Sequence, residues 1–581
     1  MVRLLRWFWV ACWGGLLVWA FWRRELSSIH FFWQGLVWGL VGLELIGLVK
    51  KERYVAFSSL VFLLWTLFVY LIYGKPGGGI EKSFLTNGDT YNLLVVLTIS
   101  FWVIWLFRNS GLLRWISRMG WQPYMVIVFS FVVLIWIGTV LLMFPFSQSV
   151  RGQVSFLDAL FTATSAVCVT GLTVLDTGRD FSLAGQLVIL GLIQFGGLGL
   201  MVFAGAFAFM MGRGLSLQSG ATLTSALGVP SFREVRHMIK SILLFTLWWE
   251  FVGTVLLFLA FSKEFPWFQA LYYGLFHSVS AFCNAGFSLF SDNLVGFRGN
   301  TLVLLTVAFL IIFGGLGFSV MRNLWWFFRR SLRMKNKRKR KENVSSAEEE
   351  KIRMMENEGY LRLHSRIVLG MTVFLIMVGM VGILMFEYNG QLAGLSFSEK
   401  VLNAFFSSVT ARTAGFNTID YGKAQPITLF LTMILMFIGA SPGSTGGGIK
   451  TTTAFLIFLN TYHVLRETLR VSVGERDVPF ENIRKAYLIF VMSLLWVLLA
   501  FGVLLVFQGG VFERLLFEVI SAFGTVGLST GITSSLSSPA KVVLIFTMFF
   551  GRVGPLALFY GIGISAQRVF VRYIQEDVMV G

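Results

Sequence analysis

The sequence is poor in the residues that enzymes and metal proteins most often use for chemistry. It has three cysteines, Cys12, Cys168 and Cys283, an odd number that all lie among apolar residues. They define neither a disulfide framework nor a zinc site. No two of the five histidines have metal-ligand spacing, and the paired carboxylates that a membrane hydrolase or glycosyltransferase needs are missing. An enzyme interpretation is therefore weak.

Charged residues are also scarce. They make up 13% of the 581 residues, whereas 56% are hydrophobic and 60 are glycine, which is far from the composition of a soluble globular protein. A helix needs about 20 apolar residues to cross the bilayer. Uncharged runs of that order recur at 119–150, 181–212, 299–321, 367–386, 424–449 and 486–512. We expect about twelve spans in total, each in contact with membrane lipid.

Basic residues outnumber acidic ones, 48 to 29. They occupy short gaps between apolar runs and one tract, 329–341, in which nine of thirteen residues are basic. The positive-inside rule explains this pattern better than nucleic-acid binding does. It predicts a multi-pass protein of the cell (inner) membrane with both termini in the cytoplasm. The first segment, 3–24, has no small-x-small cleavage site and is predicted to be an uncleaved signal anchor.

One short pattern occurs four times. Each copy begins Ser/Thr-Ala and ends at a glycine followed by Leu or Phe, and the third copy is one residue shorter; the copies are Ser165–Leu172, Ser280–Phe287, Thr410–Phe416 and Ser521–Leu528. The four glycines are 115, 129 and 112 residues apart. The widest interval contains the charged stretch 322–366, which we interpret as an insertion between repeats.

The segments before these glycines are too short to cross a bilayer. They cover 156–164, 268–279, 400–409 and 512–520, a length that fits re-entrant helices between full spans. A second glycine follows each copy after 24 to 28 residues: Gly196, Gly314, Gly439 and Gly551. We therefore predict an all-α integral membrane fold in which four pseudo-symmetric repeats, each of span, re-entrant pore loop and span, surround one pore.

The repeated glycine has a physical use in such a loop. Carbonyl groups can all point at one axis only if the backbone takes alternating unusual φ values, which glycine adopts without steric cost. A ring of carbonyls can replace the hydration shell of an ion. A single loop of small residues usually reflects close helix packing instead, but four copies in register favour the pore.

These residues, taken together, resemble the Trk/Ktr/HKT superfamily of potassium transporters. The four loops, the runs Phe195–Gly199 and Phe313–Gly317, the segment Ser441–Lys450 and the run Gly551–Pro555 carry the resemblance, which covers roughly residues 120 to 575. It implies potassium uptake across the cell membrane by a membrane pore subunit. Potassium is then the substrate, and this chain needs no cofactor of its own.

The resemblance also divides the chain. Residues 1–118 are predicted to form four extra N-terminal transmembrane helices, and 119–213 and 214–323 to form pore repeats 1 and 2. A basic cytoplasmic loop follows at 324–365, then pore repeat 3 at 366–466 with an intramembrane gate loop at 439–450, and pore repeat 4 at 467–581.

The resemblance implies that potassium binds the carbonyls of a selectivity filter. The filter residues are Val169, Thr170, Gly171, Asn284, Ala285, Gly286, Thr413, Ala414, Gly415, Thr525, Val526 and Gly527. In the family, serine at the first glycine position accompanies sodium permeation, and this chain has Gly171 there. A strong preference for potassium is the expectation.

The segment 439–450 contains five glycines and a proline, which would break a long helix. It nearly fits a phosphate-binding loop, but Ile449 separates Gly448 from Lys450 and no strand precedes it. In the family this segment gates the pore. The gate residues are then Gly443, Ser444, Thr445, Gly446, Gly447, Gly448, Lys450 and Arg552.

Two arginines lie within apolar stretches. Arg552 is central in the otherwise uncharged run 542–567, where a charge costs about 2.5 to 3.5 kcal/mol on insertion scales. We expect carbonyls of the gate loop or pore water to solvate it. Arg412 lies within the third filter loop. We expect it to point into the protein, toward Glu518 or Asp158.

Two carboxylates, Glu250 and Glu387, fall in or beside spans. They are pathway ligands or charges at helix ends, and we favour helix ends. The resemblance further implies a homodimer and a ring of soluble regulatory subunits that carry nucleotide-binding domains. The tract 329–341 and Glu348–Glu350 offer a docking surface for that ring, or a lipid-contacting or disordered loop. The alternative function is a polytopic membrane enzyme that acts on a lipid-linked substrate.

Overall fold

The computed structural model describes residues 123–150, 152, 154–211, 232–339, 361–467, 471–473 and 476–555. They fall within one compact unit, Ile99–Gly581. The four N-terminal spans expected in 1–118 lie outside the described residues, as do the acidic run 348–350 and both termini.

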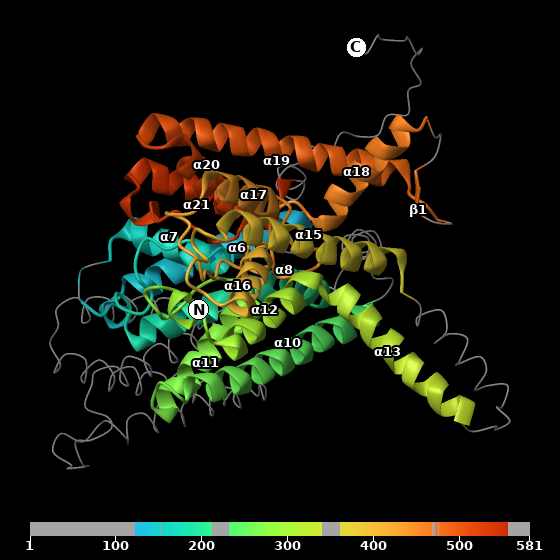
Figure 1. Cartoon of the computed structure of the whole chain (residues 1–581), viewed down its shortest axis with the longest axis horizontal. Helices are drawn as coiled ribbons and strands as arrows, with labels where there is room; N and C mark the ends of the chain where they lie inside the picture. Colours follow the sequence, from blue (N-terminus) through green and yellow to red (C-terminus); the bar gives the residue numbers. More distant parts are fainter. Residues whose placement is uncertain are drawn as a thin grey trace, which may run out of the picture. The chain divides into compact units, whose positions relative to one another are not determined.

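The described chain is almost entirely helical (Figure 1). Its longer helices are α6 (Pro123–Met143), α8 (Leu183–Met211), α10 (Phe232–Phe261), α12 (Thr301–Leu316), α13 (Phe318–Lys339), α15 (Leu363–Glu387), α17 (Pro426–Phe437), α18 (Thr451–Leu465), α19 (Phe480–Phe507) and α21 (Ser538–Val553). Four shorter helices are α7 (Phe156–Val167), α11 (Trp267–Phe282), α16 (Phe397–Thr410) and α20 (Phe512–Gly524); we call them the pore helices after the pore predicted from the sequence.

The remaining elements are small. Single 3-10 turns occur at η1 (Pro145–Ser147), η2 (Val295–Phe297) and η3 (Thr533–Ser535). A two-stranded antiparallel ribbon, β1 (Ser472–Val473) with β2 (Arg476–Asp477), joins α18 to α19. The prediction of a purely helical chain missed this ribbon.

The longest helices are apolar enough to cross a membrane. Among the described residues α10, α15 and α19 each contain a stretch long and apolar enough to cross, and α12 with α13 would form a fourth span if the bent pair counts as one. The predicted uninterrupted span at 299–321 is wrong, because the chain turns by 102° between α12 and α13. The turn falls at Gly317, whose φ of +88° is a conformation that side chains with a Cβ rarely adopt.

Local sequence sets where the pore helices begin. Ser155 accepts a hydrogen bond from the Asp158 amide ahead of α7, and Ser396 and Glu399 form a capping box ahead of α16. Both devices satisfy amide groups that a helix N-terminus leaves without partners. The four short helices expected from sequence are therefore present, each extending one to four residues past its expected C-terminal end.

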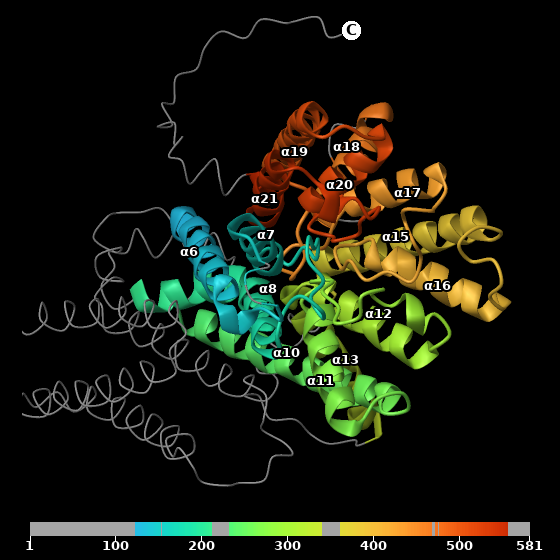
Figure 2. The same cartoon turned by 90° about the vertical axis from the view of Figure 1, so that its left-hand side faces the viewer.

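Contacts between helices of successive repeats form a closed ring. α8 packs on α10 and α11, α12 on α16, α17 on α20, and α21 on α7. In Figure 2 the colours follow one another around this ring, from the blue-green α6 to α8 to the red α19 to α21. The first and last repeats are therefore neighbours.

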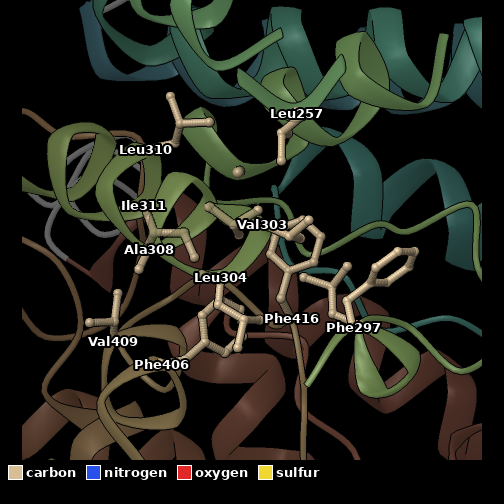
Figure 3. Packing of buried hydrophobic residues seen from close by; sticks show 14 of the residues in the cluster. Leu257, Phe297, Val303, Leu304, Ala308, Leu310, Ile311, Phe406, Val409 and Phe416 are labelled. Atoms are coloured by element: carbon tan, nitrogen blue, oxygen red, sulfur yellow. The ribbon is translucent and has the colours of Figure 1, made fainter. Parts of the chain in front are cut away.

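The junction between α10, α12 and α16 is a large apolar cluster (Figure 3). Leu257 of α10, Leu304 and Ile311 of α12, and Phe406 of α16 are buried there. Phe416, just beyond the third repeated glycine, packs into the same cluster. Close packing at this junction fixes how the loop after α16 is presented.

Candidate functional site: four glycine loops and the segment that contacts them

Each pore helix leads into a short loop that ends at the repeated glycine; we call these the glycine loops. All four glycines have positive φ: +89° at Gly171, +70° at Gly286, +80° at Gly415 and +92° at Gly527. Two residues before each glycine a second residue has positive φ; these are Val169, Asn284, Thr413 and Thr525. The unusual φ values expected from the glycines are thus confirmed, and they recur at alternate residues.

The four glycines contact one another's loops in cyclic order. A Cβ added at Gly171 would overlap the carbonyl oxygen of Ala285, and one at Gly286 would overlap that of Ala414. The same holds for Gly415 with the oxygen of Val526, and for Gly527 with the oxygen of Thr170. Glycine is therefore required at each of these positions for two reasons: its positive φ, and the nearby carbonyl oxygen of the next loop. Through these contacts the four loops that contain the predicted filter residues meet in one ring.

The Ser/Thr that begins each copy supports its loop. Ser165 Oγ accepts from the Gly171 amide at 3.0 Å, and Ser521 Oγ accepts from the Gly527 amide at 3.1 Å. Ser280 Oγ instead donates to the Phe287 carbonyl at 2.8 Å. In the shorter third loop the Gly415 amide reaches the Thr410 carbonyl at 3.4 Å. These bonds satisfy polar groups of the loops within the same repeat.

The glycine-rich segment 439–450 separates α17 from α18, as the sequence predicted. It closes on itself through the Gly439 amide, which donates to the Ile449 carbonyl at 2.9 Å. It also docks on the bend of repeat 2: the Ser441 amide donates to Gly315 O at 3.1 Å, and the Phe318 amide donates to Gly443 O at 3.0 Å.

The same segment reaches the glycine loops. The Gly447 amide donates to Thr525 Oγ1 at 3.0 Å, and Thr445 Oγ1 donates to the Phe282 carbonyl at 3.3 Å. A Cβ at Gly446 would overlap Thr413 Oγ1. The segment therefore packs directly against residues that begin the second, third and fourth loops.

Both cationic residues predicted here bind carbonyl groups. Lys450 Nζ donates to Gly446 O at 2.6 Å. Arg552, which is 5% exposed, donates to the carbonyls of Thr445 and of Gly196, the latter at 2.6 Å. The expectation that carbonyls of the 439–450 segment solvate Arg552 is confirmed, and Gly196 supplies an acceptor from α8 that was not foreseen.

Other charged residues differ from expectation. Arg412 does point into the protein, but its hydrogen bond goes to Thr372 Oγ1 of α15 at 3.5 Å rather than to Glu518 or Asp158. Glu250 lies buried in the middle of α10, bound by Gln194 Nε2 at 3.2 Å, so a helix-end position is wrong for it.

Glu387 does lie at a helix end. It is the last residue of α15, and it accepts from the Gln425 amide at 2.8 Å and from Thr428 Oγ1 at 2.7 Å, which ties α15 to the start of α17. Within the described residues no group of three or more His, Cys, Asp or Glu side chains could hold a metal ion.

Two features of the site were missed from sequence. The bend at Gly317 had no local signal, since Phe195–Gly199 has the same sequence as Phe313–Gly317 and lies within the continuous α8. The ion pair of Lys541 Nζ with Asp158 Oδ1, at 2.7 Å, joins α21 to α7 and had none. A pairing between residues this far apart in sequence requires knowledge of which repeats are neighbours.

Comparison with known proteins identifies the family. Residues 95–562 match the TrkH family, described as cation transport proteins. The chain belongs to the TrkH family. It is 37% identical over 464 residues to the Ktr system potassium uptake protein B of Vibrio alginolyticus, covering 80% of this chain and 95% of that one. The Bacillus subtilis protein of the same name is 36% identical over 476 residues, covering 82% of this chain and 99% of that one.

The fold agrees with that of a solved TrkH family member. The potassium transporter TrkH from Vibrio parahaemolyticus aligns with a TM-score of 0.53 and 18% identity, covering 92% of this chain and 96% of that chain. The chain is thus a multi-pass membrane subunit of the Ktr/Trk potassium uptake family, and it is a transporter rather than an enzyme. The resemblance inferred from the loop motifs is confirmed.

Proposed function

We propose that potassium ions cross the membrane through the ring of the four glycine loops, which acts as a selectivity filter in a pore of four pseudo-symmetric repeats. The cyclic contact of each glycine with the carbonyl of the next loop carries this proposal. Four equivalent backbones can offer carbonyl oxygens at similar distances from one axis, which is how a filter replaces the hydration shell of a large cation.

The 439–450 segment is proposed as the gate. It packs against the loops through Thr525 and carries the Arg552 contact at Thr445. A helix-breaking loop at this depth is stable only inside protein or beside water. If it lies across the pathway, its backbone obstructs passage and the arginine repels cations.

The regulatory and topological parts of the proposal come from the family. The relatives named as Ktr system potassium uptake proteins are components of a system. We therefore propose that this subunit is a homodimer controlled by a separate cytosolic ring of nucleotide-binding subunits, with both termini in the cytoplasm. Another relative, 36% identical over 468 residues, is named potassium/sodium uptake protein NtpJ, from Enterococcus hirae, so the preference for potassium over sodium needs measurement.

Replacing Gly171 by serine tests the filter. The new Cβ would overlap Ala285 O and would have to adopt a φ of +89°, which should distort one corner of the ring and favour smaller or partly hydrated ions. We expect Gly171→Ser to lower the potassium to sodium permeability ratio by roughly tenfold, the effect of about 1.4 kcal/mol. Reversal potentials in mixed potassium and sodium solutions measure it.

Two control variants separate the possible causes. Ala166→Ser changes a buried residue of α7 outside the proposed coordinating run. Gly394→Ser introduces the same φ strain, at +82°, where an added Cβ meets nothing within 4 Å. Both should keep the wild-type ratio. Equal ratios for the wild type and Gly171→Ser would remove the filter assignment.

A further inference from the structure

The four pore helices share a register that extends behind the glycine loops. In each helix a fully buried phenylalanine, at 161, 276, 406 or 517, is followed by one polar residue and then, three positions later, by the Ser/Thr that begins the repeated motif. The polar residue differs in every repeat: it is Thr162, His277, Ser407 or Glu518. All four are buried, yet they have different hydrogen-bonding capacity.

Glu518 of α20 holds the stretch beyond the fourth glycine. Its Oε1 accepts from Ser529 Oγ at 2.6 Å and from the Thr530 amide at 3.0 Å, and its Oε2 accepts from Thr533 Oγ1 at 2.8 Å. The side chain is fully buried. Among the described residues no lysine or arginine forms a salt bridge with it. The hydrogen bonds that Glu518 accepts therefore all come from the stretch 529–533 beyond the fourth glycine.

His277 of α11 plays the corresponding part in the second repeat. Its Nδ1 lies 2.7 Å from Tyr273 O, which requires a proton on Nδ1 and leaves Nε2 as an acceptor. Nε2 lies 3.0 Å from Ser288 Oγ. Ser288 is two residues after Gly286, as Ser529 is two residues after Gly527. Both side chains therefore tether the same loop position.

The first and third repeats have no carboxylate or imidazole at this position. The hydroxyls of Thr162 and Ser407 are buried and make no hydrogen bond of normal geometry in the described part of the chain, although Ser407 interacts with the Tyr421 side chain, six residues beyond Gly415. The cyclic order of glycine contacts places the second and fourth loops at opposite corners of the ring. Corners held through a glutamate or a histidine therefore alternate with corners that have only a hydroxyl at this position.

We propose that Glu518 and His277 are positioning residues that brace two opposite corners of the selectivity filter from behind. This inference rests on the proposed function of the glycine loops. Carbonyls favour potassium over smaller ions only while the ring resists closing around them. A buried acceptor with three donors stiffens the backbone two to six residues beyond Gly527. Glu518 is the dominant brace because it makes more of these bonds than His277.

The test compares potassium to sodium permeability ratios in proteoliposomes. Glu518→Gln keeps the size but reduces acceptor capacity, and Glu518→Val removes it. We expect the ratio to fall severalfold for Glu518→Gln and on the order of tenfold for Glu518→Val, since each lost bond leaves a buried donor without its acceptor. Ser529→Ala removes one donor from the loop side and should lower the ratio less. Combining it with Glu518→Gln should give less than the product of the two effects.

Thr162→Val is the matched control, because it occupies the same register and has no hydrogen bond of normal geometry to lose. Its ratio should stay within about twofold of wild type, as expected where no interaction is removed. Gly527→Ser serves as the filter control, since its Cβ would overlap Thr170 O.

The outcomes are distinguishable. Wild-type ratios for Glu518→Val and Ser529→Ala, with a lowered ratio for Gly527→Ser, would overturn the brace and keep the filter. A wild-type ratio for Gly527→Ser would overturn both. If Glu518→Val does not fold, Glu518→Gln and Ser529→Ala decide, because a purely structural role would lower protein yield without changing the ratio.

Discussion

The four repeats are alike in the ring of glycine loops and differ from one another in the layer that contacts this ring. In the ring, all four repeats use the same backbone, with positive φ at alternate residues and the same glycine-to-carbonyl contact. In the adjoining layer each repeat differs: α8 is continuous, α12 and α13 meet at a 102° bend, residues 439–450 form a loop, and α21 carries Arg552. This difference fits the proposed roles, because a filter needs equal corners, whereas a gate needs one part that can move.

The difference also shows in how the two regions are held. Glycine loops are fixed by their own pore helices, through Ser165 and Ser521 for example. The 439–450 segment is held by other repeats, through Gly315 and Thr525, and by its contact with Arg552. The segment also has bonds of its own, such as Gly439 to Ile449, but the contacts that hold it against the other repeats can be released when its neighbours shift.

The largest effect is expected from removing part of the 439–450 segment, the proposed gate. Deleting Ser444–Gly447 eliminates the contacts to Thr525 and Arg552 while the glycine loops keep their local bonds. We expect rubidium flux through the reconstituted subunit, without any regulator, to rise by more than about tenfold, because lowering a barrier by roughly 1.4 kcal/mol already gives that factor.

The permeability ratio is the internal control for this deletion. It should remain near wild type, since the loops proposed to set the ratio are supported by their own helices. A deletion that purifies as a single species yet shows unchanged or lower flux would contradict a gating role.

Removing the charge alone should have a smaller effect. A potassium ion about 10 Å from the Arg552 guanidinium, at an effective dielectric constant of about 20, is repelled by about 1.7 kcal/mol. Arg552→Ala should therefore raise the maximum uptake rate by roughly tenfold while the half-saturating concentration stays nearly constant. Initial rates of uptake over a range of potassium concentrations measure both parameters.

Arg552→Lys is the matched variant, because it keeps the charge but cannot reach Thr445 and Gly196 with one planar fork. Its maximum rate should stay close to wild type if charge is the barrier. If Arg552→Ala changes only protein abundance, Arg552 is a folding residue.

The features that could be predicted from the sequence are mostly those encoded within a single repeat. The short pore helices, the positive-φ glycines and the break at 439–450 are encoded locally, by helix length, by glycine and by proline content. Fourfold repetition strengthened each of these signals. The charge of Arg552 also constrained its surroundings, since a buried guanidinium needs acceptors.

Features that depend on which repeats are neighbours in the fold could not be predicted from the sequence. Arg412 was expected to reach Glu518 or Asp158, but Glu518 is occupied by its own loop and Asp158 by Lys541. A helix end was favoured for Glu250, and its buried position could not be foreseen because Gln194, its partner on α8, is 56 residues away. The Gly317 bend was missed because only the docked 439–450 segment distinguishes it from the continuous α8.

The smallest expected effect concerns the seam where the ring closes. Lys541 Nζ lies 2.7 Å from Asp158 Oδ1, and the two side chains are only 15% and 16% exposed. This pair joins the last repeat to the first across 383 residues, without touching a ring carbonyl. Being largely shielded from water, it should contribute more than an exposed pair, whose contribution is about 0 to 1 kcal/mol.

Lys541→Met should therefore lower the free energy of unfolding by about 1 to 2 kcal/mol, because Asp158 is left without its cation in a mostly buried position. Lys485→Met is the matched control, since its pair with Glu481 lies within one helix and is 49% and 65% exposed, so it should cost under about 0.5 kcal/mol. Thermal unfolding of the detergent-solubilised protein compares the two variants. The permeability ratio should be unchanged in both, because the seam lies outside the glycine loops. An equal loss of stability in the two variants, or a changed ratio in Lys541→Met alone, would show that the seam is not a purely structural closure.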